Sequence, residues 1–104
     1  MSTRAWSEHP EARDELLAEA DRLPPDVADL LIDHTEAAVQ DVLDSPQAWP
    51  KVPYWVEPPV LRRRAVKPFR IRVVYRVVND EVRVIAYAHE AREPGYWLQR
   101  VSSR

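Results

Sequence analysis

The segment RIRVVYRVVNDEVRVIAYAH, residues 70–89, most constrains the fold, because apolar residues recur at every second position on either side of Asn79–Asp80. A period of two in valine, isoleucine and tyrosine predicts β-strands. Asn79–Asp80 tolerates the positive φ angles of a two-residue hairpin turn. We therefore expect antiparallel strands at residues 70–78 and 81–88, a third strand at 60–66, and a short one around 3–6.

A two-residue turn also fixes which side chains share a face of this hairpin. It pairs Val78 with Glu81, and each step back along one strand then meets a step forward on the other. One face is expected to be apolar and to receive a helical layer; it carries Ile71, Val73, Tyr75, Val77, Val82, Val84, Ala86 and Ala88.

The opposite face is expected to be exposed and basic. The register predicts three cross-strand pairs there: Arg72 with Tyr87, Arg70 with His89, and Arg76 with Arg83. Like charges directly opposite each other destabilise a sheet, so the last pair favours a bound anion. Arg63, or Arg62 and Arg64, should join this face according to which parity of the third strand points outward. The alternative is a solvated face whose arginines pair with Glu81, Glu90 and Glu93.

Two amphipathic helices are predicted in the first half of the chain. Apolar residues recur at helical spacing over residues 10–21 and 26–43, and the prolines of LPPDV separate the two runs. His34 falls on the second apolar stripe and is expected in the core. The prediction is an α+β fold in one domain, residues 1–104, with an antiparallel helical hairpin on one face of a small antiparallel sheet of three to four strands.

Charge divides the chain into an acidic and a basic half. Residues 1–50 carry three basic and twelve acidic side chains, a net charge of −9, whereas residues 51–104 carry twelve basic and five acidic ones, a net charge of +7. The basic half is a candidate surface for an anionic partner. The chain has no cysteine, no signal-like apolar start and no run of 18 apolar residues, so a cytosolic protein without a membrane partner is expected.

An arginine, tyrosine and histidine set suits one reaction in particular. Arginine forks bind phosphate and aromatic rings stack on unpaired bases, so the basic face is a candidate site for single-stranded RNA. Cleavage of RNA by its own 2′-OH needs a base near that hydroxyl and cationic donors at the phosphate. This chemistry uses no cofactor, and no metal-ligand spacing is visible in the sequence.

The order of two helices before a basic sheet, together with PFRIRVVYRVVNDEVRVIAYAHEAREPGYW, resembles the RelE/ParE superfamily of type II toxin–antitoxin toxins. The resemblance covers about residues 4–100, and its most specific part is the hairpin followed by His-x-x-Arg-x-Pro-Gly-Tyr-Trp. It implies a cognate antitoxin that represses the operon, so that operator DNA is contacted only through the antitoxin. RelE-like members cut mRNA in the ribosomal A site, whereas ParE-like members inhibit DNA gyrase and lack the nuclease residues.

The resemblance also implies roles for individual residues. Arg72 matches the central-strand arginine of the nuclease members, and Arg92 matches the arginine after their last strand. Tyr96 stands in for their C-terminal tyrosine, at a shorter spacing from Arg92. The lysines of their preceding strand are not reproduced; Arg63 and Lys67 lie in that region without clear equivalence. Tyr96 and Trp97 have a second interpretation, because an aromatic pair in a C-terminal segment often anchors that segment to the core.

Three functional hypotheses follow. The first is a ribosome-dependent mRNA endoribonuclease, with Arg72 and Arg92 as donors to the phosphate and His89 or Tyr96 near the 2′-OH. The second is a non-enzymatic inhibitor of DNA gyrase that uses the basic face for protein contacts. The third is a degenerate member that mainly binds its antitoxin. The expected target-binding residues are Arg63, Arg70, Arg76, Arg83 and Tyr87.

Overall fold

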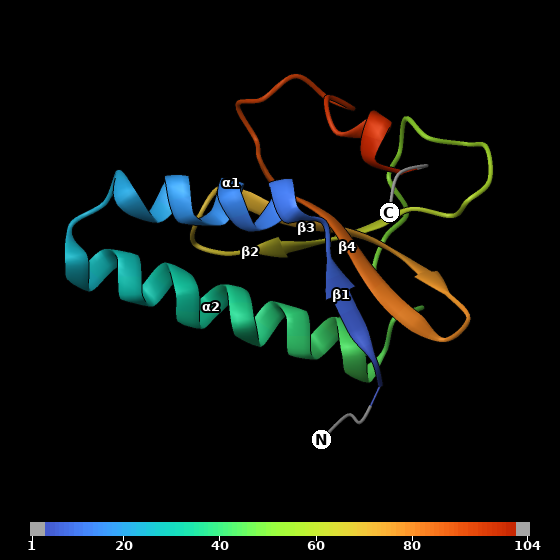
Figure 1. The fold of residues 1–104 in the computed structure, drawn as a ribbon, viewed down its shortest axis with the longest axis horizontal. Coiled ribbons are helices and arrows are strands. Elements are labelled where there is room, and N and C mark those ends of the chain that lie inside the picture. Colours follow the sequence, from blue (N-terminus) through green and yellow to red (C-terminus); the bar gives the residue numbers. More distant parts are fainter. Residues whose placement is uncertain (1–3, 102–104) are drawn as a thin grey trace.

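A computed structural model describes residues 4–101 of the chain, with a helical hairpin packed on a four-stranded sheet (Figure 1). The helices are α1 (Pro10–Asp21) and α2 (Pro25–Asp44). The strands are β1 (Trp6–Glu8), β2 (Arg62–Val66), β3 (Ile71–Val78) and β4 (Glu81–His89), and a short 3₁₀ helix, η1 (Leu98–Arg100), follows them. The predicted α+β architecture is confirmed.

The sheet has the strand order β1-β4-β3-β2 and is mixed. β2, β3 and β4 are antiparallel as predicted, whereas β1 runs parallel to β4 and pairs Ser7 with Arg83. Parallel pairing arises because the chain leaves β1 through both helices before it builds the rest of the sheet. Thr3, where the first strand was expected to begin, lies outside the described residues.

Local sequence signals explain where both helices begin. His9 caps α1, because its Nδ1 accepts a hydrogen bond from the backbone N–H of Glu11 at 3.2 Å, and Pro10 follows in the first turn. Pro25 likewise stands in the first turn of α2, which has no side-chain cap. Neither helix, nor any other in the described range 4–101, combines the length and apolar character needed to span a bilayer.

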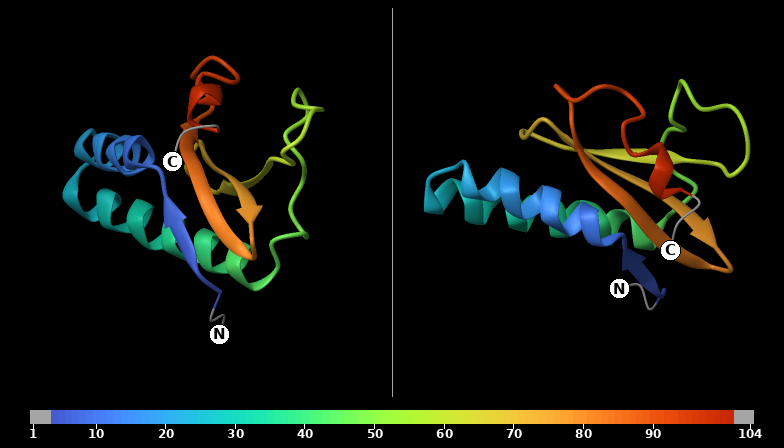
Figure 2. Two further views of the ribbon diagram at one scale, coloured as in Figure 1. Left: turned by 45° about the vertical axis from the view of Figure 1, so that its right-hand side comes forward. Right: turned by 45° about the horizontal axis from the view of Figure 1, so that its top comes forward.

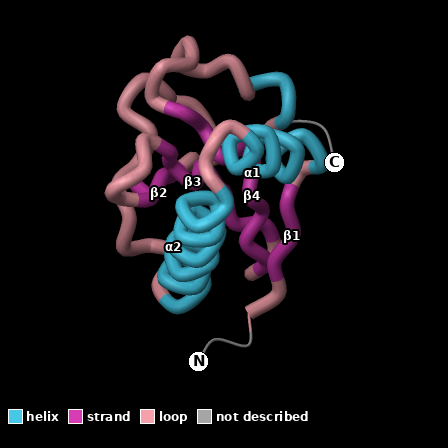
Figure 3. The backbone as a smooth tube through the Cα atoms, turned by 90° about the vertical axis from the view of Figure 1, so that its left-hand side faces the viewer, coloured by secondary structure: helices cyan, strands magenta, loops and turns pink. Residues whose placement is uncertain are grey.

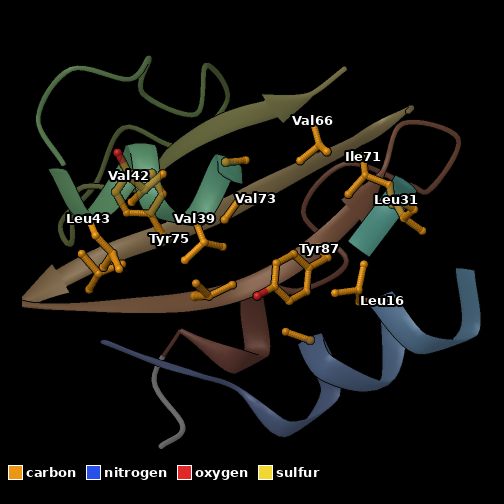
Figure 4. Close-up of a cluster of buried hydrophobic side chains, with 14 residues drawn as sticks. Leu16, Leu31, Val39, Val42, Leu43, Val66, Ile71, Val73, Tyr75 and Tyr87 are labelled. Carbon is orange, nitrogen blue, oxygen red and sulfur yellow. The ribbon is translucent and has the colours of Figure 1, made fainter. Parts of the chain in front are cut away.

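The core lies on both faces of the sheet. The inner cluster, on the helical side, includes Leu16, Leu31, Val42, Val73 and Tyr75 (Figure 4). The expectation that His34 belongs here is wrong: it is exposed and its ring lies 5.9 Å from that of Phe69, while the adjacent Thr35 takes the buried position.

A second cluster covers part of the face that was expected to be exposed. This outer cluster comprises Val52, Leu61, Val74, Ile85, Ala86, Trp97 and Val101. Its residues come from the loop between α2 and β2, from β3 and β4, and from the C-terminal segment. Figure 2 shows that loop on the side of the sheet away from the helices, and Figure 3 shows the helices on the near side. The predicted basic face is therefore interrupted at its centre by apolar packing.

A β-bulge in β4 changes which residues share a face. The turn has the predicted positive φ angles, 51° at Asn79 and 67° at Asp80, and the first pairs from the turn follow the predicted register. Between the pairs Tyr75–Val84 and Val74–Ala86, however, Ile85 is an additional residue on β4. Every later side chain of β4 consequently lies on the face opposite to the predicted one.

The bulge overturns two of the three predicted cross-strand pairs. Arg76 does lie opposite Arg83, but Arg72 lies opposite Ala88 rather than Tyr87, which pairs with Val73. His89 pairs with Ile71 instead of Arg70, whose carbonyl oxygen accepts a hydrogen bond from the N–H of Glu90 at 2.8 Å. Tyr87 and His89 thus belong to the helical side of the sheet.

The stability of the protein should depend on Tyr75 at alkaline pH. Tyr75 is fully buried and its hydroxyl donates to the Pro46 carbonyl oxygen at 2.6 Å; burial raises its pKa to about 12, an effect that nearby Arg62 opposes. Between the unfolded pKa of about 10 and this value the folded state binds more protons, so the free energy of unfolding falls as pH rises through that window. Chemical denaturation from pH 9 to 12 should show a shallower fall in Tyr75→Phe than in the parent. Equal slopes would contradict this assignment.

Candidate functional site

A basic groove lies at one end of the outer face. Five cations line it, Lys51, Arg63, Arg64, Lys67 and Arg72, and Trp49, Pro50 and Pro53 form part of its wall. Of these cations, Arg64 is paired with Asp41 at 2.6 Å. Arg63 and Arg72 reach it because both stand on the outer side of their strands, where Arg63 pairs with Val74 and Arg72 with Ala65. The groove has a volume of about 690 Å³.

The groove carries more positive than negative charge. Arg72 has one carboxylate nearby, with its Nη2 3.8 Å from Oε2 of Glu90, and its side chain is 34% exposed. Such a surface pair contributes at most about 1 kcal/mol. It leaves most of the N–H donors of the guanidinium available to another anion. Apart from Arg64, which Asp41 neutralises, the lining cations therefore make a positive concavity suited to an anionic surface.

Arg76 and Arg83 form a separate group toward the β3–β4 turn. Both point to the outer face, but Val74, which is 2% exposed and packs in the outer cluster with Trp97, stands between Arg72 and Arg76 on β3. The arginines predicted to make one continuous face thus fall into two groups. Arg70 is exposed and immediately precedes β3, beyond the last residue pair of β2 and β3.

Tyr87 was expected on the exposed face and is instead 3% exposed in the inner cluster (Figure 4). Its hydroxyl donates to Oε2 of Glu8 at 2.6 Å. Burial, and then the hydrogen bond to Glu8, raise the pKa of Tyr87 far above its usual range. This side chain is therefore not placed to stack on an external base, and the bulge at Ile85 is the reason.

His89 lies at the end of β4 on the helical side. Its Nδ1 accepts a hydrogen bond from the N–H of Ala91 at 3.0 Å, so the neutral ring carries its proton on Nε2. That nitrogen points toward α1 and lies 4.0 Å from Oε2 of Glu19. His89 and Arg72 consequently occupy opposite faces of the sheet.

Arg92 and Tyr96 follow β4 and meet above α1. The guanidinium carbon of Arg92 lies 3.8 Å from the centre of the Tyr96 ring, a cation–π contact. The Tyr96 hydroxyl donates to Oε2 of Glu15. Burial and this hydrogen bond raise the pKa of Tyr96 above its usual range, so the phenol stays protonated at neutral pH and is not available to accept a proton.

Three of the four residues predicted to be catalytic share one pocket. His89, Arg92 and Tyr96 line a cavity of about 350 Å³ together with Glu15 and Glu19. Arg72 does not reach it, because it lies on the other face of the sheet. The pocket mixes cations with two carboxylates, so it is less suited to a polyanion than the basic groove.

Glu15 is a residue of this site that the sequence prediction missed. It accepts hydrogen bonds from Nη1 and Nη2 of Arg100 at 3.0 and 3.1 Å, besides the one from Tyr96. A signal was present: Glu11, Glu15 and Glu19 repeat every four residues along α1, and like charges at that spacing destabilise a helix unless cations lie opposite. Arg100 supplies such a cation, since it also lies 3.5 Å from Glu11.

Comparison with known proteins agrees with this architecture. The family model described as the ParE toxin of the type II toxin–antitoxin system, parDE, matches residues 8–94. No curated protein matches the sequence. The matched range begins at the end of β1 and includes both helices, the remaining strands and the segment that carries His89 and Arg92. The chain therefore belongs to the ParE toxin family of type II toxin–antitoxin systems, within the RelE/ParE superfamily, and has an antitoxin as its partner.

Proposed function

We propose that this toxin inhibits DNA gyrase by binding it through the basic groove, and that it does so without cleaving RNA. The observation that carries the proposal is the position of Arg72 on the opposite face of the sheet from His89 and Tyr96. Cleavage of RNA by its own 2′-OH requires base and cationic donors around one phosphate. Residues on two faces of a sheet do not meet that requirement.

The state of the tyrosines supports the same proposal. The hydroxyls of Tyr87 and Tyr96 each donate to a glutamate, and the pKa of each is raised by burial. Neither is suited to remove a proton at neutral pH. A non-enzymatic inhibitor needs only a complementary surface, and the cations clustered around the basic groove provide one for an acidic patch on a protein.

A ribosome-dependent mRNA endoribonuclease is the second candidate. It is favoured by the common pocket of His89, Arg92 and Tyr96, in which a histidine, an arginine and a tyrosine lie within one cavity. In that case the cytosolic targets would be the ribosome and its mRNA, and Arg72 would act only in docking. Gyrase inhibition thus depends on the groove and not on the pocket, whereas RNA cleavage depends on the pocket.

Variants of each site separate the two candidates. We expect Arg63→Glu and Arg72→Glu, singly and together, to raise the toxin concentration for half-inhibition of gyrase supercoiling by about tenfold or more, about 1.4 kcal/mol of binding free energy or more. His89→Ala with Tyr96→Phe should leave that concentration within about twofold. The measurement uses purified toxin, gyrase, ATP and relaxed plasmid.

The matched control for the groove variants is Arg22→Glu, a charge reversal at a side chain that is 74% exposed just after α1. Arg22 borders the pocket of His89 and Tyr96 and not the groove, so it serves as a control for the groove alone. Growth after induction and the 5′ ends of cellular mRNA should be followed in the same strains. Cuts in translated messages with unchanged supercoiling, lost in the His89 and Tyr96 variant, would overturn the gyrase proposal in favour of the nuclease. Toxicity that survives in every variant would overturn both.

A further inference from the structure

A row of polar side chains crosses three strands on the outer face, away from the basic groove. Ser7 on β1 pairs with Arg83 on β4, which pairs with Arg76 on β3. Neighbours across a sheet point to the same side, so the three side chains stand next to one another. They border a cavity of about 220 Å³, which Arg100 and Val101 close from the C-terminal segment.

Arg76 is the cation of this cavity whose charge is not compensated. Arg83 pairs with Glu81 at 3.3 Å, and Arg100 pairs with Glu15. Within residues 4–101 no ion pair or side-chain hydrogen bond of Arg76 occurs, and its Nε is buried without a hydrogen-bond partner. A buried N–H without an acceptor and a like-charged neighbour directly across the sheet both cost free energy.

We propose that this cavity binds one carboxylate group, held by Arg76 and completed by Arg83 and the Ser7 hydroxyl. The Nε–H and one Nη–H of a guanidinium point in parallel and match the two oxygens of a carboxylate. If the guanidinium of Arg76 turns into the cavity, the bound group satisfies Nε and separates the two arginines electrostatically. Binding thus removes both unfavourable features at once.

The charge balance favours a carboxylate over a phosphate. Of the acidic residues that line the cavity, Glu8 is 2.6 Å from Nε of Arg13 and also accepts from Tyr87, while Glu81 pairs with Arg83. One guanidinium charge, that of Arg76, therefore remains to be neutralised, and a monoanion neutralises it. A dianionic phosphate would add repulsion from Glu8 and Glu81. The carboxylate comes either from a free small acid or from an Asp or Glu side chain of a docked protein, which offer the same chemistry.

The proposal is tested by NMR on the full chain, with the arginine Nε–Hε signals observed directly. Sodium acetate replaces sodium chloride at constant ionic strength, and the Nε–Hε signal of Arg76 is expected to shift saturably and to exchange more slowly with water. Arg76→Lys keeps the charge but loses the paired donors, so the acetate response of the Arg83 signal should fall by about fivefold or more. Arg70→Lys, the same substitution at an exposed arginine, should leave both responses unchanged.

Two capped peptides, Gly-Glu-Gly and Gly-Gln-Gly, distinguish the sources of the carboxylate. A response to acetate and to the glutamate peptide alone assigns the site to a protein side chain, and a response to acetate without either peptide assigns it to a free acid. The proposal is overturned by a stronger response to phosphate than to acetate, by no response, or by a non-saturating one that is equal at Arg70. If Arg76→Lys does not fold, Ser7→Ala should weaken acetate binding in its place. This site is separate from the basic groove, so its failure leaves the gyrase proposal unaffected.

Discussion

Replacement of Trp97 by alanine is expected to lower the free energy of unfolding by about 3–5 kcal/mol, the range for a fully buried tryptophan. Trp97 is 1% exposed and packs in the outer cluster with Val74, Ile85 and Val101. It connects the C-terminal segment to the face of the sheet that the helices leave uncovered. Its loss would open a cavity there and expose the two central strands. Urea denaturation followed by circular dichroism measures the change.

The neighbouring Leu98 provides the matched control. It is 37% exposed, so Leu98→Ala should cost less than about 1 kcal/mol. A similar small cost for Trp97→Ala would contradict the role given to the outer cluster. The same cluster separates Arg72, in the groove, from Arg76, in the proposed carboxylate site.

Most of the fold follows from local sequence signals. The helix bounds predicted from periodicity, 10–21 and 26–43, agree with α1 and nearly with α2, and Asn79–Asp80 makes the predicted turn. The anchoring role of Trp97 is likewise confirmed by its burial. These features depend on neighbours within a few positions, which is the range over which propensity and pattern act.

The faces of β4 beyond the bulge could not be predicted in the same way. Ile85 is neither a glycine nor a polar residue, and the run VRVIAYAH reads equally well in either phase. What selects the bulge is tertiary packing: Ile85 and Ala86 both enter the outer cluster, and Tyr87 turns inward to reach Glu8. A single added residue reverses every later side chain, so this error moved Tyr87 and His89 to the wrong face.

The site residues likewise differ in how far the sequence could place them. Arg63 and Arg72 reached the outer face because β2 and β3 keep a regular pairing with each other. Glu15 was missed because its partners Tyr96 and Arg100 are 81 and 85 positions away, and no local pattern encodes such a contact. The acidic repeat along α1 indicated only that cations should lie opposite.

Removal of the Glu15 carboxylate should destabilise the protein by about 3–5 kcal/mol, because it leaves the charge of Arg100 buried and without its main partner. The side chains of Glu15 and Arg100 are 14% and 11% exposed. Glu15→Ala is therefore expected to cost far more than Glu11→Ala, whose side chain is 66% exposed and lies 3.5 Å from the same arginine. Denaturation curves of the two variants give the comparison.

A double variant shows whether the effect belongs to the ion pair or to the carboxylate alone. Replacing both partners, as Glu15→Leu with Arg100→Met, should recover most of the lost stability, because an apolar pair of similar volume carries no desolvated charge. Amide hydrogen exchange at residues 97–101 should follow the same order, fastest in Glu15→Ala. A cost of less than about 1 kcal/mol for Glu15→Ala would mean that this carboxylate does not hold the C-terminal segment in place. The hydrogen bond from the Tyr96 hydroxyl to Glu15 would then be too weak to keep that hydroxyl from other partners. That result would remove one of the two grounds for preferring gyrase inhibition to RNA cleavage.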